Sequence, residues 1–437
     1  MVFVLSSDQQ PLDPCHPARA RQLLRRGRAR LVRRFPATIQ LLDRTAAQST
    51  THGLRLKIDP GSRTTGLALV AEPTAPVVWA AELTHRSAAI RDALLARRGH
   101  RRQRRQRHTR YRPARFNNRR RPAGWLAPSL RSRVDHILTW LRRLRGVCPL
   151  TAISVELVRF DTQALVNPEI TGVEYQQGEL VGYEVREYLL EKWQRTCAYC
   201  GATGVPLQVE HLVPRSRRGS DRVSNLTLAC EPCNQRKGSQ TAAEYGFPQL
   251  MALAQRPLRD AAAVNSTRWA LYASLQATGL PVEAGTGGRT KYNRTRLGWV
   301  KTHWQDAAAV GASTPERLRI VTPQVLQITA TGRGLHSRTK LDKYGFPRLR
   351  LPRQKRFFGY QTGDMVEAIV TTGTKQGRYH PEGTRRVAVR ASGSFNVTTA
   401  MGTVQGLHHR FFRLVQRADG YRYASQPTSR LLDPLTS

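Results

Sequence analysis

The sequence predicts a multidomain protein of the α/β class. The chain has 437 residues, which is enough for two or three domains with a sizeable core. Strand-like and helix-like stretches alternate over roughly its first two thirds, as in a core of mixed secondary structure. Two Cys-x-x-Cys pairs near the middle enclose a short segment that one metal ion can hold together.

The charge balance points to a polyanionic partner. Lys and Arg number 71 against 30 Asp and Glu, which gives a net charge of +41. A surplus this large favours nucleic acid as the partner. No apolar run is long enough to span a bilayer, so we expect no membrane partner. The cysteine usage and the lack of a signal peptide fit a reducing cytosol, and we expect a cytoplasmic protein.

Residues 1–50 are interpreted as a small basic unit. We expect strands over Met1–Leu5, Arg30–Arg33 and Thr38–Leu41, a turn over Pro11–Pro14, and a helix over Pro17–Arg26. Its arginines favour phosphate binding, with a solvated basic surface as the alternative. These are Arg25, Arg26, Arg28, Arg30, Arg33 and Arg34.

Acidic residues end two predicted core strands. Leu54, Leu56 and Ile58 alternate along a strand that ends at Asp59, and Gly66–Val70 runs back as a second strand. An Asp in this position is often only a turn residue. However, Ala152–Glu156 predicts another buried strand with a carboxylate at its end.

A third acid lies on a predicted helix. His303 and Asp306 are three residues apart and share one helix face. Together with Asp59 and Glu156 they can converge on two metal ions, which activate water and stabilise the leaving oxygen during phosphodiester cleavage.

An arginine-rich segment separates Asp59 from Glu156. From Arg91 to Arg121 there are 14 Arg and two His. Without an apolar stripe it cannot pack as a core helix. Arg side chains bind phosphates and stack on bases, so we expect nucleic-acid binding, with a disordered basic tail as the alternative. The candidate contacts are Arg97, Arg98, Arg101, Arg102, Arg104, Arg105, Arg107, Arg110 and Arg112. An amphipathic helix from Leu130 to Leu144 should then pack on the sheet.

Four cysteines predict a structural zinc site. Cys197 and Cys200 are separated from Cys230 and Cys233 by 29 residues, a spacing that suits tetrahedral Zn2+. Two disulfides or four idle thiols are the alternative. Cys15 and Cys148 are interpreted as apolar fillers.

The residues between the cysteine pairs suit phosphodiester hydrolysis. Glu210 and His211 end a predicted strand, Asn225 follows after 13 residues, and Asn234 follows after eight more. A neutral His can deprotonate water, and carboxylate and amide oxygens can hold Mg2+ on the scissile phosphate. A zinc knuckle that only binds nucleic acid is the alternative.

This pattern resembles the HNH nuclease ββα-metal motif. The resemblance implies that His211 is the general base, that Glu210 and Asn234 hold Mg2+ (or Mn2+), and that Asn225 positions His211.

The chain beyond the cysteine segment is expected to change character. Helices are predicted over Met251–Gln255 and Arg259–Gly279, a strand over Leu280–Glu283, and a loop over Gly285–Arg289 without the context of a phosphate-binding loop. Arg289, Lys291, Arg294 and Arg296 are expected to face nucleic acid. From about Thr322, short alternating runs and frequent turns predict an all-β domain with a binding role.

The order of these features carries a second resemblance. Asp59, Glu156, Asp306 and His303, with the cysteine segment inserted between them, resemble a split RuvC nuclease site on a ribonuclease H-like fold. The arginine-rich segment resembles the bridge helix that grips a guide RNA. The whole chain is similar to the IscB family of transposon-encoded RNA-guided nucleases. It departs from the family at Pro11-Leu12-Asp13-Pro14, where Pro-Leu-Met-Pro is usual.

The resemblance implies a domain order as well as a fold class, namely a ribonuclease H-like (RuvC) core split in three with an inserted zinc-stapled HNH domain. The expected boundaries are 1–50 for an N-terminal basic domain, 51–90, 128–181 and 249–315 for the RuvC parts, 91–127 for the bridge helix, 182–248 for HNH, and 316–437 for a β-rich domain that binds guide RNA and the target-adjacent motif.

The resemblance also implies a function. An omega RNA guides cleavage of double-stranded DNA by a monomeric ribonucleoprotein, the HNH site cuts the guide-paired strand, and the Asp59, Glu156, Asp306 site cuts the displaced strand. The metal ions are Mg2+ (or Mn2+) at both sites and structural Zn2+. A guide-free HNH homing or restriction-type endonuclease and a non-catalytic RNA-guided DNA-binding protein stay open as alternatives.

Overall fold

A computed structural model describes most of the chain. The described residues are 1–72, 76–107, 124–157, 186, 189–190, 192–255, 259–332, 339–344, 346–350, 354–379, 384–399 and 401–428. They belong to two compact units. The first combines Met1–Leu157 with Trp269–Ser437, and the second is Val158–Arg268, inserted between those segments.

The first unit begins with a small sheet that one helix covers. Its strand order is β2-β1-β4-β3, with β1 (Val2–Leu5) parallel to β4 (Thr38–Leu41). β2 (Pro11–Cys15) and β3 (Ala29–Arg33) flank them. Helix α1 (Pro17–Arg25) follows His16, whose Nδ1 accepts from the Ala18 amide at 3.2 Å, and it buries Ala20 and Leu23.

One expectation for this region is wrong. Pro11–Pro14 is part of strand β2, and the reversal of the chain lies earlier, where the Ser6 amide donates to the Gln10 carbonyl at 2.9 Å. Leu12 pairs with Val4 and is 5% exposed, so burial of this leucine outweighs the turn preference of its two proline neighbours.

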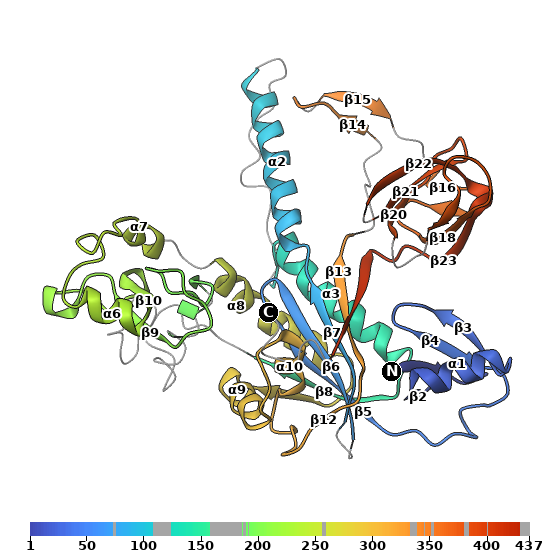
Figure 1. The fold of residues 1–437 in the computed structure, drawn as a ribbon, viewed down its shortest axis with the longest axis horizontal. Coiled ribbons are helices and arrows are strands. Elements are labelled where there is room, and N and C mark those ends of the chain that lie inside the picture. Colours follow the sequence, from blue (N-terminus) through green and yellow to red (C-terminus); the bar gives the residue numbers. More distant parts are fainter. Residues whose placement is uncertain are drawn as a thin grey trace. The chain divides into compact units, whose positions relative to one another are not determined.

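An eight-stranded mixed sheet forms the core of the first unit (Figure 1). Its main path is β11-β8-β5-β6-β7-β13-β24, and β12 (Arg319–Ile320) pairs with β7. The strands are β5 (Leu54–Asp59), β6 (Thr64–Ala71), β7 (Pro76–Thr84), β8 (Leu150–Glu156), β11 (Val282–Gly285), β13 (Gln324–Ala330) and β24 (Tyr421–Pro427). β5, β6 and β7 are antiparallel neighbours, whereas β8 runs parallel to β5 and β11 runs parallel to β8.

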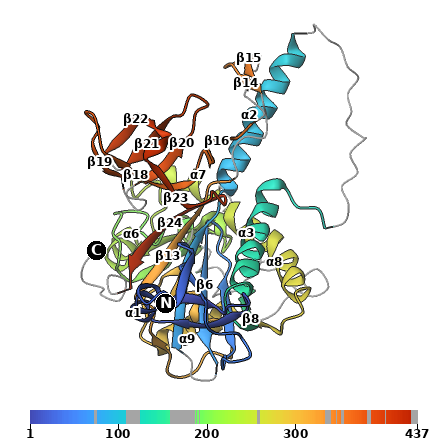
Figure 2. The same cartoon turned by 90° about the vertical axis from the view of Figure 1, so that its right-hand side faces the viewer.

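Helices cover both faces of this sheet. Helix α3 (Pro128–Arg145) lies along the sheet (Figure 2). Its Ile137, Trp140 and Leu144 share a core cluster with Leu56 and Leu67, as expected from its amphipathic pattern. Leu271 and Leu275, near the end of helix α8 (Arg259–Gln276), join the same cluster. On the other face, helix α10 (His303–Ala308) packs Trp304, Ala307 and Ala308 against Ala68 and Val70.

The sheet encloses a lysine that the strand pattern does not predict. Lys57 is fully buried on β5, and its Nζ donates to the Val310 carbonyl and to Thr314 Oγ1, both at 2.8 Å. Burial lowers the pKa of Lys57 to about 7. These bonds attach the middle of β5 to the segment that follows α10.

Two other helices differ in how far they match expectation. Helix α2 (Ser87–Gln106) has no buried residue, as expected for a segment without an apolar stripe. Helix α9 (Gly287–Arg296) starts inside the expected Gly285–Arg289 loop, because the Thr286 side chain caps it by accepting from the Arg289 amide at 3.2 Å. The strand before it, β11, also begins two residues later than expected.

Short strands dominate the end of the chain. β18 (Met365–Val370) pairs with β19 (Gly377–Tyr379) and β23 (Phe412–Gln416), and β21 (Ser394–Thr399) pairs with β20 (Thr384–Ala388) and β22 (Gly402–His408). The hairpins β14 (Thr339–Leu341) with β15 (Pro347–Arg350) and β16 (Arg356–Phe357) with β17 (Tyr360–Gln361) are smaller, and η4 (His409–Phe411) precedes β23.

These strands do not form a compact unit of their own. The two three-stranded sheets share a core around the fully buried Phe395. β13 and β24, however, belong to the central sheet, and the whole stretch lies in the first unit. A separate C-terminal all-β domain therefore stays a prediction.

The second unit is small and built around one hairpin. β9 (Leu207–His211) and β10 (Leu226–Cys230) are antiparallel, and the turns η2 (Arg215–Arg217) and η3 (Val223–Asn225) lie in their connection. Helix α6 (Glu231–Lys237) follows β10 directly, and α7 (Gln249–Gln255) comes later. Leu207, Leu226 and Leu228 lie in the apolar cluster of this unit.

No helix within the described parts of the chain is both long enough and apolar enough to cross a membrane.

Candidate active sites and zinc cluster

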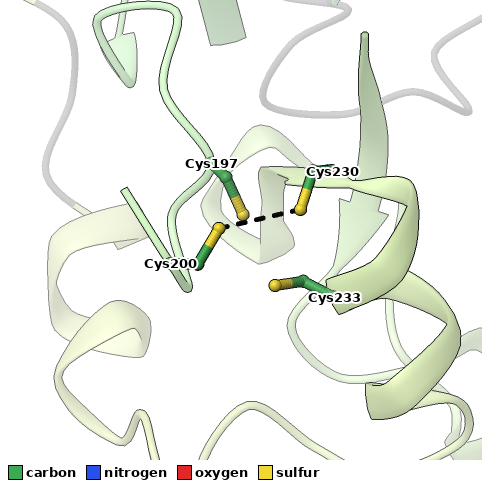
Figure 3. A group of neighbouring side chains, drawn as sticks. All are labelled: Cys197, Cys200, Cys230 and Cys233. Atoms are coloured by element: carbon green, nitrogen blue, oxygen red, sulfur yellow. Dashed lines mark hydrogen bonds between the residues drawn. The ribbon is translucent and has the colours of Figure 1, made fainter. Parts of the chain in front are cut away.

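The four cysteines of the second unit converge on one point (Figure 3). The sulfur atoms of Cys197, Cys200, Cys230 and Cys233 all lie within 4.8 Å of one another, and those of Cys200 and Cys230 are 3.7 Å apart. Tetrahedral zinc with Zn–S bonds of about 2.3 Å requires sulfurs about 3.8 Å apart. The cluster therefore fits Zn2+, and among the described residues it is the only group of three or more candidate ligands gathered this tightly.

The local backbone explains this convergence. Cys230 ends β10 and Cys233 lies in the first turn of α6, while the Cys197 amide donates to the Ala202 carbonyl at 2.9 Å in a tight turn. Burial opposes ionisation of Cys197, but backbone N–H groups directed at its sulfur outweigh burial and lower its pKa to about 7. A thiol that ionises near neutral pH is ready to bind a metal ion. Cys148, in contrast, lies in the core of the first unit, where burial raises its pKa to about 12.

His211 lies at the end of β9, as predicted, and faces a carboxylate. Its Nε2 donates to Asp221 Oδ1 at 2.7 Å. Arg215 also donates to that oxygen, at 2.8 Å. The hydrogen bonds from Arg215 and then from His211 lower the pKa of Asp221. Asp221 thus stays ionised and holds one imidazole nitrogen, which leaves Nδ1 as the nitrogen able to accept a proton.

Asn225 braces the loop that follows His211. Its Oδ1 accepts from the Val213 amide at 2.9 Å, and its Nδ2 donates to the Val213 carbonyl at 2.9 Å and to the Ser220 carbonyl at 2.8 Å. The structure therefore connects Asn225 to His211 through the backbone rather than through the imidazole ring. The positioning role of Asn225 stays a prediction.

Glu210 is held from two sides. Its Oε1 accepts from Lys237 Nζ at 2.7 Å, and its Oε2 accepts from the Tyr199 hydroxyl at 2.8 Å. Glu210 is 6% exposed and Lys237 is 1% exposed, so this is a buried ion pair. Burial and then the charge of Glu210 raise the pKa of Tyr199, so its hydroxyl stays a donor. Asn234 uses its amide nitrogen for Gln208 at 2.6 Å, an orientation in which Oδ1 is the atom that can serve a metal ion.

A second acidic site lies at the edge of the central sheet. Asp59 ends β5 and Glu156 ends β8, and since these strands are parallel with Ile58 opposite Val155, their last residues are neighbours. Asp306 comes from α10. Burial, then the charge of Glu156 and then that of Asp306 raise the pKa of Asp59 well above its usual value.

A histidine and an arginine adjoin this acidic site. His303 Nδ1 lies 4.0 Å from Asp59 Oδ2. Arg294 forms an ion pair with Asp306, and its side chain is 13% exposed; that Arg294 faces nucleic acid stays a prediction. Gly66 allows α10 to lie this close, because a Cβ on Gly66 would stand 1.8 Å from the His303 carbonyl oxygen.

The arginine-rich helix buries none of its residues, and its arginines from Arg97 to Arg105 are exposed. Seven of the nine predicted nucleic-acid contacts lie in the described part: Arg97, Arg98, Arg101, Arg102, Arg104 and Arg105 on α2, and Arg107 directly after it. The guanidinium of Arg107 stacks 4.4 Å from the ring centroid of Phe346. Arg110 and Arg112 lie outside the described residues.

Sequence analysis missed three residues that touch the predicted ones, namely Tyr199, Asp221 and Lys237, and it missed the contact of Arg294 with Asp306. Each meets its partner only through the fold, so no spacing rule marks it. The sole local signal is that Lys237 lies four residues after Cys233 on a helix, which predicts a shared face.

Comparison with known proteins defines the class of the second unit. Residues 197–240 match the family described as HNH endonuclease. The chain therefore carries an HNH endonuclease domain, which is the domain of a nuclease that acts on DNA.

Residues 2–178 match a second family, described as RRXRR protein. Among solved structures, similarity is found to Streptococcus thermophilus Cas9 in complex with the GGAA PAM, at 14% identity and a TM-score of 0.20, over 43% of this chain. The Type II-C Cas9 enzyme from Actinomyces naeslundii is similar at 19% identity and a TM-score of 0.16, over 41% of this chain. The chain spans only 26% of the length of either protein. No curated protein matches it.

Proposed function

We propose that this protein is an RNA-guided DNA endonuclease of the IscB family with two cutting sites. The observation that carries the proposal is the presence of two separate clusters of acidic and histidine side chains, one in the HNH endonuclease domain and one at the edge of the central sheet. Two sites in one chain suit a nuclease that cuts both strands of double-stranded DNA.

In the HNH domain, His211 acts as the general base. Asp221 holds Nε2–H, so Nδ1 takes the proton from the attacking water. Glu210 and Asn234 hold Mg2+ (or Mn2+), which would stabilise negative charge on the scissile phosphate. The fit is partial: both oxygens of Glu210 already accept one hydrogen bond, yet a carboxylate has further lone pairs, and Asn234 presents its oxygen. Asn225 fixes the loop that carries Val213 and Ser220.

At the second site, Asp59, Glu156 and Asp306 act as a RuvC-like set of metal ligands. Neighbouring carboxylates that repel one another are stabilised by cations; Glu156 and Asp306 are buried, and the raised pKa of Asp59 reflects its burial and their charges. His303, 4.0 Å from Asp59, is the group that can exchange a proton with the attacking water. Arg294 supplies positive charge to Asp306 in the absence of substrate. The parallel pair β5 and β8, each ending in an acid, supports a ribonuclease H-like core.

Helix α2 binds the guide in this proposal. A helix with seven arginines and no buried residue is positioned to neutralise phosphates rather than to build a core. The guide is a structured omega RNA that pairs with one DNA strand, the HNH site cuts that strand, and the RuvC-like site cuts the displaced one. The working particle is a monomeric ribonucleoprotein in the cytoplasm, and the gene belongs to a transposon.

The first test is to express the chain with its flanking DNA, purify it, and sequence the RNA that comes with it. One discrete structured RNA with a variable end is the expected result and defines the target. A smear of host RNA would contradict guidance and favour a guide-free HNH endonuclease, which the HNH domain alone can explain.

The second test separates the two sites. With the guide and Mg2+ present, His211→Ala should leave a nick in the displaced strand only. Asp59→Ala should leave a nick in the guide-paired strand only. Strand-resolved gels in which either variant still makes double-strand breaks contradict the two-site mechanism. The absence of any cutting by the unaltered protein would favour a non-catalytic binding protein.

A further inference from the structure

The two groups that hold Glu210 are attached to different cysteine pairs. Tyr199 lies between Cys197 and Cys200 in the first pair. Lys237 lies on α6, one helical turn after Cys233 of the second pair. The Tyr199 hydroxyl and the Lys237 ammonium reach opposite oxygens of Glu210, at 2.8 and 2.7 Å. Glu210 therefore bridges the two halves of the cysteine cluster from the side of the proposed catalytic histidine.

This network is buried, so it tolerates little rearrangement. Tyr199 is 8% exposed, Glu210 is 6% exposed and Lys237 is 1% exposed. A buried carboxylate that loses a partner cannot turn to water for a replacement, and it must either move or become protonated. The position of Glu210 thus depends on where Tyr199 and Lys237 stand.

The same network also reaches the backbone of His211. Lys237 Nζ donates to the His211 carbonyl at 2.9 Å in addition to its bond with Glu210. One ammonium group therefore fixes both the side chain before His211 and the main chain of His211 itself. Its ring is fixed separately, by Asp221.

We infer that Tyr199 and Lys237 are positioning residues for His211, and that the cysteine cluster sets where they stand. The inference rests on the proposed role of His211 as the base. Bringing the two cysteine pairs together around Zn2+ brings the hydroxyl and the ammonium to opposite sides of Glu210. The metal cluster thereby determines the geometry of the strand end that carries the base, in addition to stabilising the unit.

A purely structural ion pair would behave differently. Removing such an ion pair would lower the stability of the unit. The folded protein, however, would keep the end of β9 in place and would cleave DNA at its normal rate. A positioning network changes the folded state itself. The measurements must therefore be made on folded, zinc-loaded protein.

The test compares Tyr199→Phe with Tyr245→Phe in the full chain with its RNA. Both variants lose only a hydroxyl, and the two rings pack edge to face with centroids 5.3 Å apart. Of these two tyrosine hydroxyls, it is that of Tyr199 that donates a hydrogen bond to Glu210. Zinc content by mass spectrometry should stay at that of the unaltered protein in both. Hydrogen exchange over residues 207–213 should speed up at least several-fold in Tyr199→Phe and stay unchanged in Tyr245→Phe.

Cleavage gives the second readout. In single-turnover assays at saturating DNA, Tyr199→Phe should cut the strand assigned to the HNH site about 10- to 100-fold more slowly, the usual effect of losing a supporting hydrogen bond at such a site. The apparent affinity for DNA and cutting of the other strand should not change. Removing zinc with a chelator should speed up exchange over the same residues 207–213 in the unaltered protein.

A double variant without either charge of the ion pair controls for unfolding of the unit. Lys237→Met alone leaves Glu210 without its cation and can unfold the unit, so it is combined with Glu210→Gln. The double variant should stay folded and retain zinc, yet show fast exchange at residues 207–213.

The outcomes separate this inference from the proposed function. Unchanged exchange over residues 207–213 in Tyr199→Phe overturns the inference, whatever happens to cleavage. Faster exchange with a normal cutting rate also overturns it, because His211 would then not depend on the network. If the unaltered protein cuts no DNA, the proposed function fails, and the exchange comparison still decides whether the cysteine cluster holds the His211 strand end.

Discussion

His136 should make the first unit sensitive to acid. Its ring stacks on His85 with centroids 5.7 Å apart and meets the edge of Tyr421. Burial, and then the charge of Arg86, lower the pKa of His136 to about 4, only partly opposed by Asp135. The usual pKa of histidine is about 6.5.

The direction in which the unfolding free energy changes with pH follows from proton binding. Between about pH 6.5 and pH 4 the unfolded chain holds a proton on His136 and the folded chain does not, so the free energy of unfolding falls as the pH falls. The gap of about 2.5 pKa units corresponds to about 3.5 kcal/mol, since each unit is worth about 1.4 kcal/mol. Most of that loss should have occurred by pH 4, and it should be complete below that pH.

His136→Phe keeps an aromatic ring against His85 and Tyr421 but removes the titration. Urea unfolding of both proteins should be followed from pH 7.5 to 4 by tryptophan fluorescence, since Trp79 and Trp140 lie in the same core cluster. From pH 7.5 to 4, the unaltered protein should lose about 2 to 3 kcal/mol more unfolding free energy than His136→Phe does. Carboxylates titrate in both proteins and cancel in the difference. Parallel stability curves would refute the reasoning.

Three further predictions concern the proposed sites. Gly66→Ala should displace α10, lower the free energy of unfolding by on the order of 1–3 kcal/mol and slow cleavage of the displaced strand, because its Cβ would stand 1.8 Å from the His303 carbonyl oxygen. As a control, Gly99→Ala on helix α2, where a Cβ meets nothing within 4 Å, should raise the free energy of unfolding by about 0.5–1 kcal/mol. Equal melting temperatures of the two variants would contradict the close packing at Gly66. Cys233→Ser should release the zinc and expose the second unit to limited proteolysis, whereas Cys15→Ser should do neither; full zinc content in Cys233→Ser would rule out a four-cysteine site. Asp221→Asn should slow cutting by the HNH site about 10- to 100-fold with unchanged DNA affinity, while Glu244→Gln, which removes a comparable exposed partner of Arg217, should not; equal rates would show that Asp221 is a surface charge only.

Sequence reasoning succeeded where local pattern decides structure. The alternation of Leu54, Leu56 and Ile58 predicted β5, and the cysteine spacing predicted the cluster that the structure shows. The roles assigned to His211, Asp59 and the other site residues stay predictions, although the fold brings Asp59, Glu156 and Asp306 to one sheet edge.

The same reasoning failed where distant contacts decide. Pro11–Pro14 forms a strand because Leu12 finds a core partner in Val4 across the sheet. Lys57 looks like the exposed face of an alternating strand, yet α10 and the segment after it cover that face. Arg294 was expected to face nucleic acid and Lys237 carried no prediction, and each is paired with a buried acid. Sequence spacing carries no record of such partners.

Strand β24, which completes the central sheet, is synthesised near the end of the chain. β24 pairs with β13, and its Tyr423 stacks on Phe35 with centroids 5.3 Å apart. Just before β24, Asp419 accepts from Arg143 at 3.1 Å and forms an ion pair with Arg33. Arg33 therefore waits for a partner that leaves the ribosome 386 residues later, and Arg143 of helix α3 waits for the same partner over 276 residues. During synthesis the growing sheet keeps an unpaired edge at β13, and a chain released before β24 is made would lack the contacts of Asp419 and Tyr423 with the N-terminal segment.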